Sequence, residues 1–402
     1  MTRSVLAVAD SDSYVKWAAA TLDSLPDVRP HLVVLRTRVR PDDAQTTSAL
    51  AGTRWAGSVL DDHSLLGLAA RLRRTRPDVI LVASTGPAAE LVIRLVATLP
   101  YRPVVVTGLP GMSIPATPRA LRFRAGADVF VVHSHRERLA FEDMATDTGV
   151  RPAFAVNRLP FLRGSAGEHA AFDDAPVRRV VFAPQAKFPE TPEQRRAVLQ
   201  ALAALARARP DVEVVVKLRA RPGQAQTHDE AYPFDILWDE LGSDAPVRLV
   251  TGPLADQLAA GTALVSVSST ALLEALGHGL RALVLSDFGV GDANLTGVYE
   301  GSGLVGTLRD VEQARFFHPD RAWLADNYFH VEPDELAAVL AEVDVSGPVR
   351  PGPPVGGRRA QARRYARTAL PLPRPFPSVR VFGRHGDRRL GRTGEVSRGA
   401  GS

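Results

Sequence analysis

Three consecutive hydroxyl residues, Ser268, Ser269 and Thr270, separate two apolar runs in the stretch VSVSSTALLEALGHGLRALVL. The first run predicts a buried strand, and apolar residues recur at helical spacing from Ala271 onward. Hydroxyls at the start of a helix can cap it by accepting hydrogen bonds from its first amides. The same amides, with the positive end of the helix dipole, attract phosphate. The residues alone leave both interpretations open.

Charged side chains near this stretch extend the phosphate interpretation. Glu274 lies one turn into the predicted helix, where its carboxylate could accept hydrogen bonds from a pair of ribose or sugar hydroxyls. The alternative is a first-turn glutamate that the helix dipole stabilises. An earlier run, VEVVVKLRARPG, predicts a strand that ends near Lys217 and is followed by Arg219 and Arg221. Guanidinium groups match the geometry of phosphate oxygens, so these cations could neutralise a phosphate.

The elements that must position these residues follow from the hydrophobic pattern. Short apolar runs alternate with helical patterns, which predicts βαβ units and parallel sheets. A polar segment with Pro and Gly interrupts the alternation at residues 157–176, after which it restarts. We therefore predict an α/β fold with two tandem Rossmann-like, doubly wound domains, residues 1–156 and 177–345. Because ligands bind at the carboxyl ends of parallel strands, the site should lie in the cleft between the domains.

The net charge of +5 is unevenly distributed. Residues 346–402 contain 13 arginines and two acids, so the rest of the chain has a net charge of −6. This balance argues against nucleic-acid binding by the body of the protein. The Arg-, Pro- and Gly-rich tail is expected to be disordered or loosely attached. Its stretch RRAQARRYARTAL could form a basic helix that contacts an anionic membrane, or could remain solvated.

Composition and missing motifs exclude several classes of protein. There is no cysteine, which rules out disulfides and thiolate metal sites. The apolar run at the N-terminus is too short for a signal peptide, and no stretch approaches the roughly 20 apolar residues of a membrane helix. We therefore expect a cytoplasmic protein, at most peripheral to the membrane. The sequence has no P-loop, dinucleotide-binding glycine motif, hydrolase elbow or H-E-x-x-H motif, so neither a cofactor nor a metal site is predicted.

Taken in order, the motifs resemble the donor-nucleotide half of GT-B glycosyltransferases. They are most similar to the bacterial branch that builds capsular polysaccharides, which includes polysialyltransferase-like and CDP-glycerol transferase-like enzymes; the abundance of Arg and Ala is typical of an actinobacterial genome. The resemblance rests on the strand–SST–helix–ALVL pattern, on RRVVFAPQ with its polar turn at Gln185, and on the strand that ends at Lys217. The family's His-Pro pair after this lysine is absent, and His228 follows later, in QTHDE.

The resemblance implies roles for these residues. The hydroxyl cluster would hold the donor phosphates and Glu274 the ribose. Either His228 replaces the missing family histidine on a longer loop, or arginines alone neutralise the phosphates. The predicted donor-binding residues are Gln185, Lys217, Arg219, Ser268, Ser269, Thr270 and Glu274.

In GT-B enzymes the N-terminal domain binds the acceptor and supplies the general base that takes the proton of the attacking hydroxyl. Asp10 and Asp12 follow the first predicted strand and are the candidates for this base, with an Asx-turn or a helix cap as the alternative. Gly108 and Gly111, in TGLPGMS, allow close approach of an acceptor. His133 or His135 could line the cleft, and Ser134 with Glu137 could form a capping box at the start of the next helix.

These inferences predict a metal-independent glycosyltransferase that moves a sugar, or a sugar-like polyol phosphate, from a nucleotide donor to a cell-envelope polysaccharide or glycolipid. One alternative is a nucleotide-sugar 2-epimerase, although no clear set of carboxylates and histidine stands out. A catalytically inactive homologue acting as a partner is a second alternative, because the His-Pro pair is missing. A two-domain binding protein is a third, although such proteins are generally exported.

Overall fold

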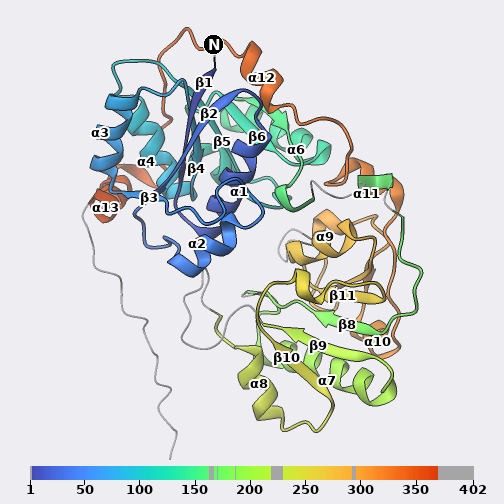
Figure 1. Ribbon diagram of the computed structural model, residues 1–402. Helices are drawn as coiled ribbons and strands as arrows, with labels where there is room; N and C mark the ends of the chain where they lie inside the picture. Colours follow the sequence, from blue (N-terminus) through green and yellow to red (C-terminus); the bar gives the residue numbers. More distant parts are fainter. Residues whose placement is uncertain are drawn as a thin grey trace, which may run out of the picture.

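The computed structural model describes residues 2–162, 167–169, 171–185, 187–218, 230–291 and 296–369. Within these residues the chain forms two α/β domains, drawn one above the other in Figure 1, and each is built around a parallel sheet. The predicted fold class is confirmed. None of the described helices is long and apolar enough to cross a membrane.

The N-terminal domain has seven described strands in the order β3-β2-β1-β4-β5-β6-β7, all paired in parallel. The strands are β1 Arg3–Ala9, β2 Val28–Leu35, β3 Asp61–His63, β4 Val79–Ala83, β5 Val104–Gly108, β6 Val129–Val132 and β7 Ala153–Val156. The helices between them are α1 Asp12–Ser24, α2 Asp43–Leu50, α3 Leu65–Thr75, α4 Gly86–Val96, α5 Pro118–Arg122 and α6 His135–Thr148.

The C-terminal domain has six described strands in the order β10-β9-β8-β11-β12-β13, also all parallel. The strands are β8 Arg179–Phe182, β9 Glu213–Lys217, β10 Val247–Val250, β11 Thr262–Ser266, β12 Arg281–Leu285 and β13 Val305–Gly306. The helices are α7 Pro192–Ala208, α8 Phe234–Leu241, α9 Thr270–Gly277, α10 Leu308–Glu312 and α11 Arg321–Asp326, and short 3-10 turns include Pro160–Leu162 and Gly297–Tyr299.

Both sheets are covered by apolar side chains on both faces. Successive residues of β1 alternate between two clusters, because Val5 and Ala7 pack with α1 on one face whereas Leu6 and Val8 pack with α3 and α4 on the other. Two-sided burial explains why these strands are continuous apolar runs rather than alternating ones. It also leaves the strand ends as the places where polar residues can gather.

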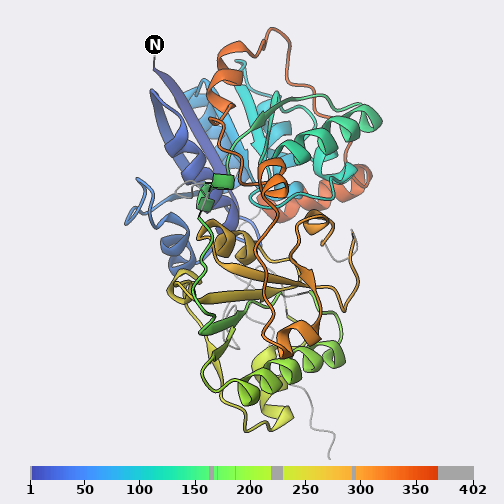
Figure 2. The ribbon, with the colours of Figure 1, turned by 90° about the vertical axis from the view of Figure 1, so that its right-hand side faces the viewer.

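The chain returns to the N-terminal domain near its end, so the predicted boundary at residue 345 is too late. Leu336 and Leu340 of α12 (Leu336–Glu342) are buried in the same cluster as β1 and α1. The Leu336 amide donates to the Asn157 side chain at 3.0 Å, and the Val156 amide donates to the Glu335 carboxylate at 2.8 Å. Figure 2 shows both crossings of the chain between the domains. The physical reason is that apolar residues of α12 fill a core that residues 1–156 leave open.

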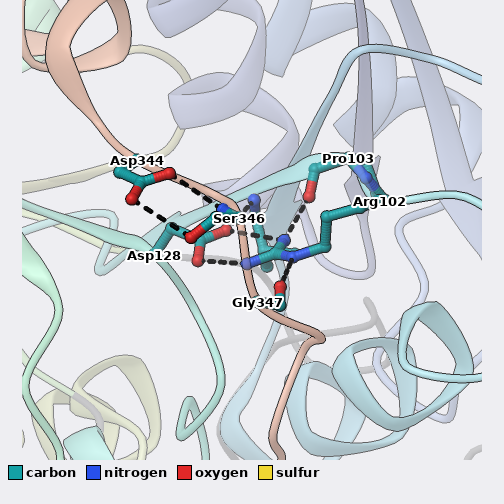
Figure 3. Close-up of polar contacts among 7 residues, drawn as sticks. Arg102, Pro103, Asp128, Asp344, Ser346 and Gly347 are labelled. Atoms are coloured by element: carbon teal, nitrogen blue, oxygen red, sulfur yellow. Dashed lines mark hydrogen bonds and ion pairs between the residues drawn. The ribbon is translucent and has the colours of Figure 1, made fainter.

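The first part of the predicted loose tail is packed on the N-terminal domain. Arg102 donates to the Gly347 carbonyl at 2.7 Å while its guanidinium pairs with Asp128 (Figure 3). Further along, α13 (Gly357–Ala369) lies against α3 and α4, and Arg364 pairs at 2.6 Å with Glu90, which is buried. The expectation of a loosely attached tail is therefore corrected for residues 346–369. Residues 370–402 lie outside the described part of the chain.

Candidate functional site

The hydroxyl cluster lies at the carboxyl end of β11, as predicted. Ser268 is buried, and its hydroxyl and amide both bond to the Gln185 side chain, at 3.0 and 3.1 Å. Ser269 is the N-cap of α9 and accepts a hydrogen bond from the Ala271 amide at 3.2 Å. Gln185 follows β8, the strand next to β11. The turn is therefore braced by the neighbouring strand exit, and the capping interpretation holds for Ser269.

Positively charged side chains of both domains act on the Glu274 carboxylate. Burial raises the pKa of its carboxyl, and the positive charges of Lys16, His278 and Lys217 act in the opposite direction. Lys16 comes from α1 of the N-terminal domain, whereas Lys217 ends β9. The sequence contains only three lysines, and the charges of two of them act on this one carboxylate. Sequence reasoning missed Lys16, because nothing in its local context indicates a neighbour in the other domain.

The loop after β5 lies directly against the hydroxyl cluster. A Cβ added to Gly111 would stand 3.5 Å from the γ-methyl of Thr270, so the Gly111 backbone lies close to the Thr270 side chain. The Tyr299 hydroxyl lies 3.4 Å from both the Ser269 carbonyl and the sulfur of Met112. Figure 1 shows α9 on the side of the C-terminal domain that faces the N-terminal domain. The strand exits of the two sheets therefore meet.

The two candidate bases have different surroundings. Asp10 is fully buried, and its carboxylate accepts hydrogen bonds from the Thr85 amide at 2.8 Å and the Thr85 hydroxyl at 2.5 Å. Burial raises the pKa of Asp10 to about 6, although Thr85 and the nearby Arg124 oppose the shift. Asp12 is the first residue of α1 and is half-buried. Of the two carboxylates, Asp12 is therefore the one that a bound molecule could contact directly.

The residues predicted to bind the acceptor have structural partners. His133 is buried, with Nδ1 2.7 Å from the Asn157 carbonyl and Nε2 2.8 Å from the Leu109 carbonyl. Gly108 is buried, and a Cβ there would stand 2.7 Å from the Trp17 ring. Both residues hold the loops after β5 and β6 in place. Gly111 is partly exposed and is the one of the three that borders the other domain.

Glu137 makes more hydrogen bonds than the predicted capping box requires, and they differ from that motif. Ser134 caps α6, accepting from the Glu137 amide at 3.0 Å. The Glu137 carboxylate accepts from the His133 amide at 2.8 Å rather than from the N-cap amide. It also accepts from the Ser113 amide and from the Tyr328 hydroxyl, both at 2.7 Å. This buried carboxylate therefore ties α6 to the loop after β5 and to the returning chain.

Three predicted residues cannot be placed. Arg219, Arg221 and His228 lie outside the described residues. Two cavities of the described chain lie away from the strand exits. One, of about 500 Å³, is at the amino ends of β8 and β12, and the other, of about 580 Å³, lies between α3, α4 and α13. The candidate site therefore rests on the contacts between the strand exits and not on a cavity.

A cluster that the sequence did not predict lies at the second crossing. His135, His330 and Glu332 have ligand atoms that all lie within 4.8 Å of one another. Burial lowers the pKa of His330, and the nearby positive charge of His135 acts in the same direction. The expectation that the histidines form no metal-type set was based on local spacing. His135 and His330 are far apart in the sequence, so no motif could reveal them.

Comparison with known proteins identifies the family. Residues 5–343 match the model of the family described as "Putative glycosyltransferase (DUF6716)". The chain belongs to this family. No curated protein sequence matches it at a significant level.

Solved structures similar to this DUF6716 protein share its two-domain fold. The Staphylococcus aureus MnaA–UDP structure has a TM-score of 0.51 at 12% identity, covering 81% of this chain and 92% of that chain. The Methanocaldococcus jannaschii UDP-GlcNAc 2-epimerase in complex with UDP-GlcNAc and UDP has a TM-score of 0.51 at 11% identity, covering 84% and 99%. At these identities the likeness shows the fold alone, in which two parallel-sheet domains stand in tandem.

Proposed function

We propose that the protein transfers a sugar, or a sugar-like polyol phosphate, from a nucleotide-activated donor to a cell-envelope polysaccharide or glycolipid. The observation that carries the proposal is the meeting of polar strand exits from two domains, where the charges of Lys16 and Lys217 both act on Glu274. Family membership supports the reaction class. The donor, the acceptor and the residue roles are part of the proposal.

The donor would bind at the start of α9. Amides of the first turn point out of the helix and, with the dipole, attract phosphate. Lys217 would neutralise the phosphates, since its position at the end of β9 is next to the exit of β8. Glu274 would bind ribose or sugar hydroxyls, and the positive charges of Lys16, His278 and Lys217 favour its ionised, hydrogen-bond-accepting form against the burial that raises its pKa. Leaving-group charge would be met by these amides and cations, which requires no metal ion at the reacting bond.

The acceptor would approach from the N-terminal domain. Asp12 would take the proton from the attacking hydroxyl. Asp10 would contribute to the electrostatic environment of Asp12 at the same strand exit. The described part of the tail supports an acceptor on a membrane, because α13 carries exposed arginines at Arg358, Arg359, Arg363 and Arg367. Cationic side chains on one helix bind anionic lipid surfaces.

Nucleotide binding tests the donor site. UDP is the first probe because the two similar structures contain it, and GDP, CDP, CMP and ADP complete the set. A ligand that binds only the folded chain raises its melting temperature. We expect one nucleotide to raise the melting temperature. Lys217→Ala, or the Ser268→Ala/Ser269→Ala pair, should weaken its binding about ten- to hundredfold, because charge-assisted hydrogen bonds are lost.

Matched controls separate binding from folding. Ser64→Ala removes the N-cap of α3, which also accepts an amide hydrogen bond but lies in the other domain. Arg207→Ala removes an exposed cation of α7. Neither should change nucleotide affinity. If no nucleotide shifts the melting temperature at millimolar concentration, the donor site is rejected. If a nucleotide sugar is converted without any acceptor, the epimerase alternative replaces the transferase.

A further inference from the structure

The cluster of His135, His330 and Glu332 joins two segments that are distant in the sequence. His135 is the first residue of α6, directly after the N-cap Ser134. His330 and Glu332 lie on the segment that returns from α11 to α12. The cluster therefore sits where the chain crosses between the domains, at the start of α6.

His330 is a buried imidazole without a protein hydrogen bond. Its side chain is 1% exposed, and neither ring nitrogen has a hydrogen-bond partner among the described residues. Nδ1 lies 3.3 Å from Glu332 Oε2, but the two atoms do not form a hydrogen bond. Buried polar groups in native proteins are almost always satisfied, so an unpaired imidazole needs an explanation. A bound ion or molecule between these side chains would supply the missing partner.

Two of the three distances between the ligand atoms match the edges of a metal coordination tetrahedron, and the third, between the two imidazole nitrogens, is within 4.8 Å. Zn²⁺ binds imidazole nitrogen and carboxylate oxygen at about 2.1 Å, which places neighbouring ligand atoms of a tetrahedron about 3.4 Å apart. Glu332 Oε2 lies 3.3 Å from His330 Nδ1 and 3.6 Å from His135 Nε2. Two imidazoles and one carboxylate form a known zinc ligand set that leaves a fourth position open to water. Glu332 is exposed and His135 is partly exposed, so an ion can enter from solvent.

The charges around the cluster are compatible with a cation. Glu332 and Asp334 act on His330 as negative charges, and Arg158 acts as a positive one. The Arg158 amide and guanidinium are bonded to the Asp334 carboxylate and the Val331 carbonyl, which accounts for its position beside the cluster. The carboxylate of Glu332 would compensate part of the charge of a divalent ion.

We propose that His135, His330 and Glu332 bind a divalent transition-metal ion, with Zn²⁺ as the best match, at the second crossing between the domains. The ion fastens the start of α6 to the returning chain. Nearby contacts also join the start of α6 to the C-terminal domain. Arg136 donates to carbonyls of the Gly297–Tyr299 turn at 3.1 and 3.2 Å. The proposed role of the ion is to hold the domains in register.

Calorimetric titration tests the site on the full chain, without an affinity tag and after treatment with EDTA. We expect Zn²⁺ to bind one site and to raise the melting temperature. Mg²⁺ should not compete, since imidazole ligands favour zinc and its transition-metal neighbours. His135→Ala and Glu332→Gln should each weaken Zn²⁺ binding at least about tenfold, because removal of even an outer-shell partner costs about that much.

Variants and a spectroscopic probe keep the test informative. His330→Ala could destabilise the fold because the ring is buried, so the test relies on the variants of the partly exposed His135 and the exposed Glu332. His31→Ala and Glu300→Gln remove an exposed histidine and an exposed glutamate elsewhere, and should leave Zn²⁺ affinity unchanged. Co²⁺ should give a visible absorption band in the wild-type chain that His135→Ala abolishes. Zn²⁺ binding with equal affinity in all variants, or no binding, would overturn the proposal.

Discussion

The exchange Asp10→Asn should stabilise the folded protein at neutral pH. Asn is nearly the same size as Asp, can accept from the Thr85 amide through its oxygen, and can donate to the Thr85 hydroxyl. It therefore imitates the protonated form of Asp10. The exchange removes a buried charge whose ionisation the fold disfavours.

The magnitude follows from the pKa of Asp10. Burial raises it from 3.8 to about 6, and at about 1.4 kcal/mol per unit the ionised carboxylate costs the folded state about 3 kcal/mol. The folded state binds the proton more tightly than the unfolded state, so stability falls as pH rises from about 4 to about 6 and then levels off. The advantage of Asp10→Asn should therefore grow from about 1 kcal/mol near pH ~4.5 to about 3 kcal/mol near pH ~8.

Urea unfolding of both chains across this pH range is the assay. Thr85→Val is the second arm, because the Thr85 hydroxyl stabilises the ionised carboxylate. It should destabilise the wild-type chain near neutral pH more than it destabilises the Asp10→Asn chain. A stability difference between wild type and Asp10→Asn that does not change with pH, or an Asp10→Asn chain that is the less stable near pH ~8, would refute the reasoning.

Two further predictions concern a glycine and the basic helix. Gly108→Ala should lower the free energy of unfolding, measured in urea, by about 1–3 kcal/mol, because its Cβ would overlap the Trp17 ring. Gly111→Ala makes an ordinary 3.5 Å contact and should stay within about 0.5 kcal/mol of wild type. Arg363→Gln on α13 should weaken co-sedimentation with anionic lipid vesicles about fivefold, near 1 kcal/mol per arginine, while Arg207→Gln on α7 should not. Equal binding by both arginine variants would contradict membrane contact through α13.

The alternation of strands and helices could be predicted because its causes are local. The strand predicted to end near Lys217 is β9, Glu213–Lys217, and the helix predicted from Ala271 is α9, Thr270–Gly277. In such segments the periodicity of apolar residues reports which faces are buried. The position of Ser269 at a strand exit followed for the same reason.

Pairings between the domains could not be predicted. Lys16 acts on Glu274, and Thr270 lies against Gly111, although nothing near any of these residues indicates its partner. The same limit explains the misplaced boundary at residue 345. The residues of α12 resemble any amphipathic helix, and only the open core of the N-terminal domain determines where Leu336 packs.

By itself, the sequence determined the element types, the two parallel sheets, the polar strand exits and the separation of basic tail from acidic body. These depend on backbone hydrogen bonding and side-chain burial within a few residues of one another. The tertiary structure decided which strand exits meet, that the lysine charges act on Glu274, and that His135 and His330 lie near Glu332. Those outcomes depend on how the two domains pack. Packing brings together residues that are distant in the sequence, and the neighbours of one residue do not indicate its partner.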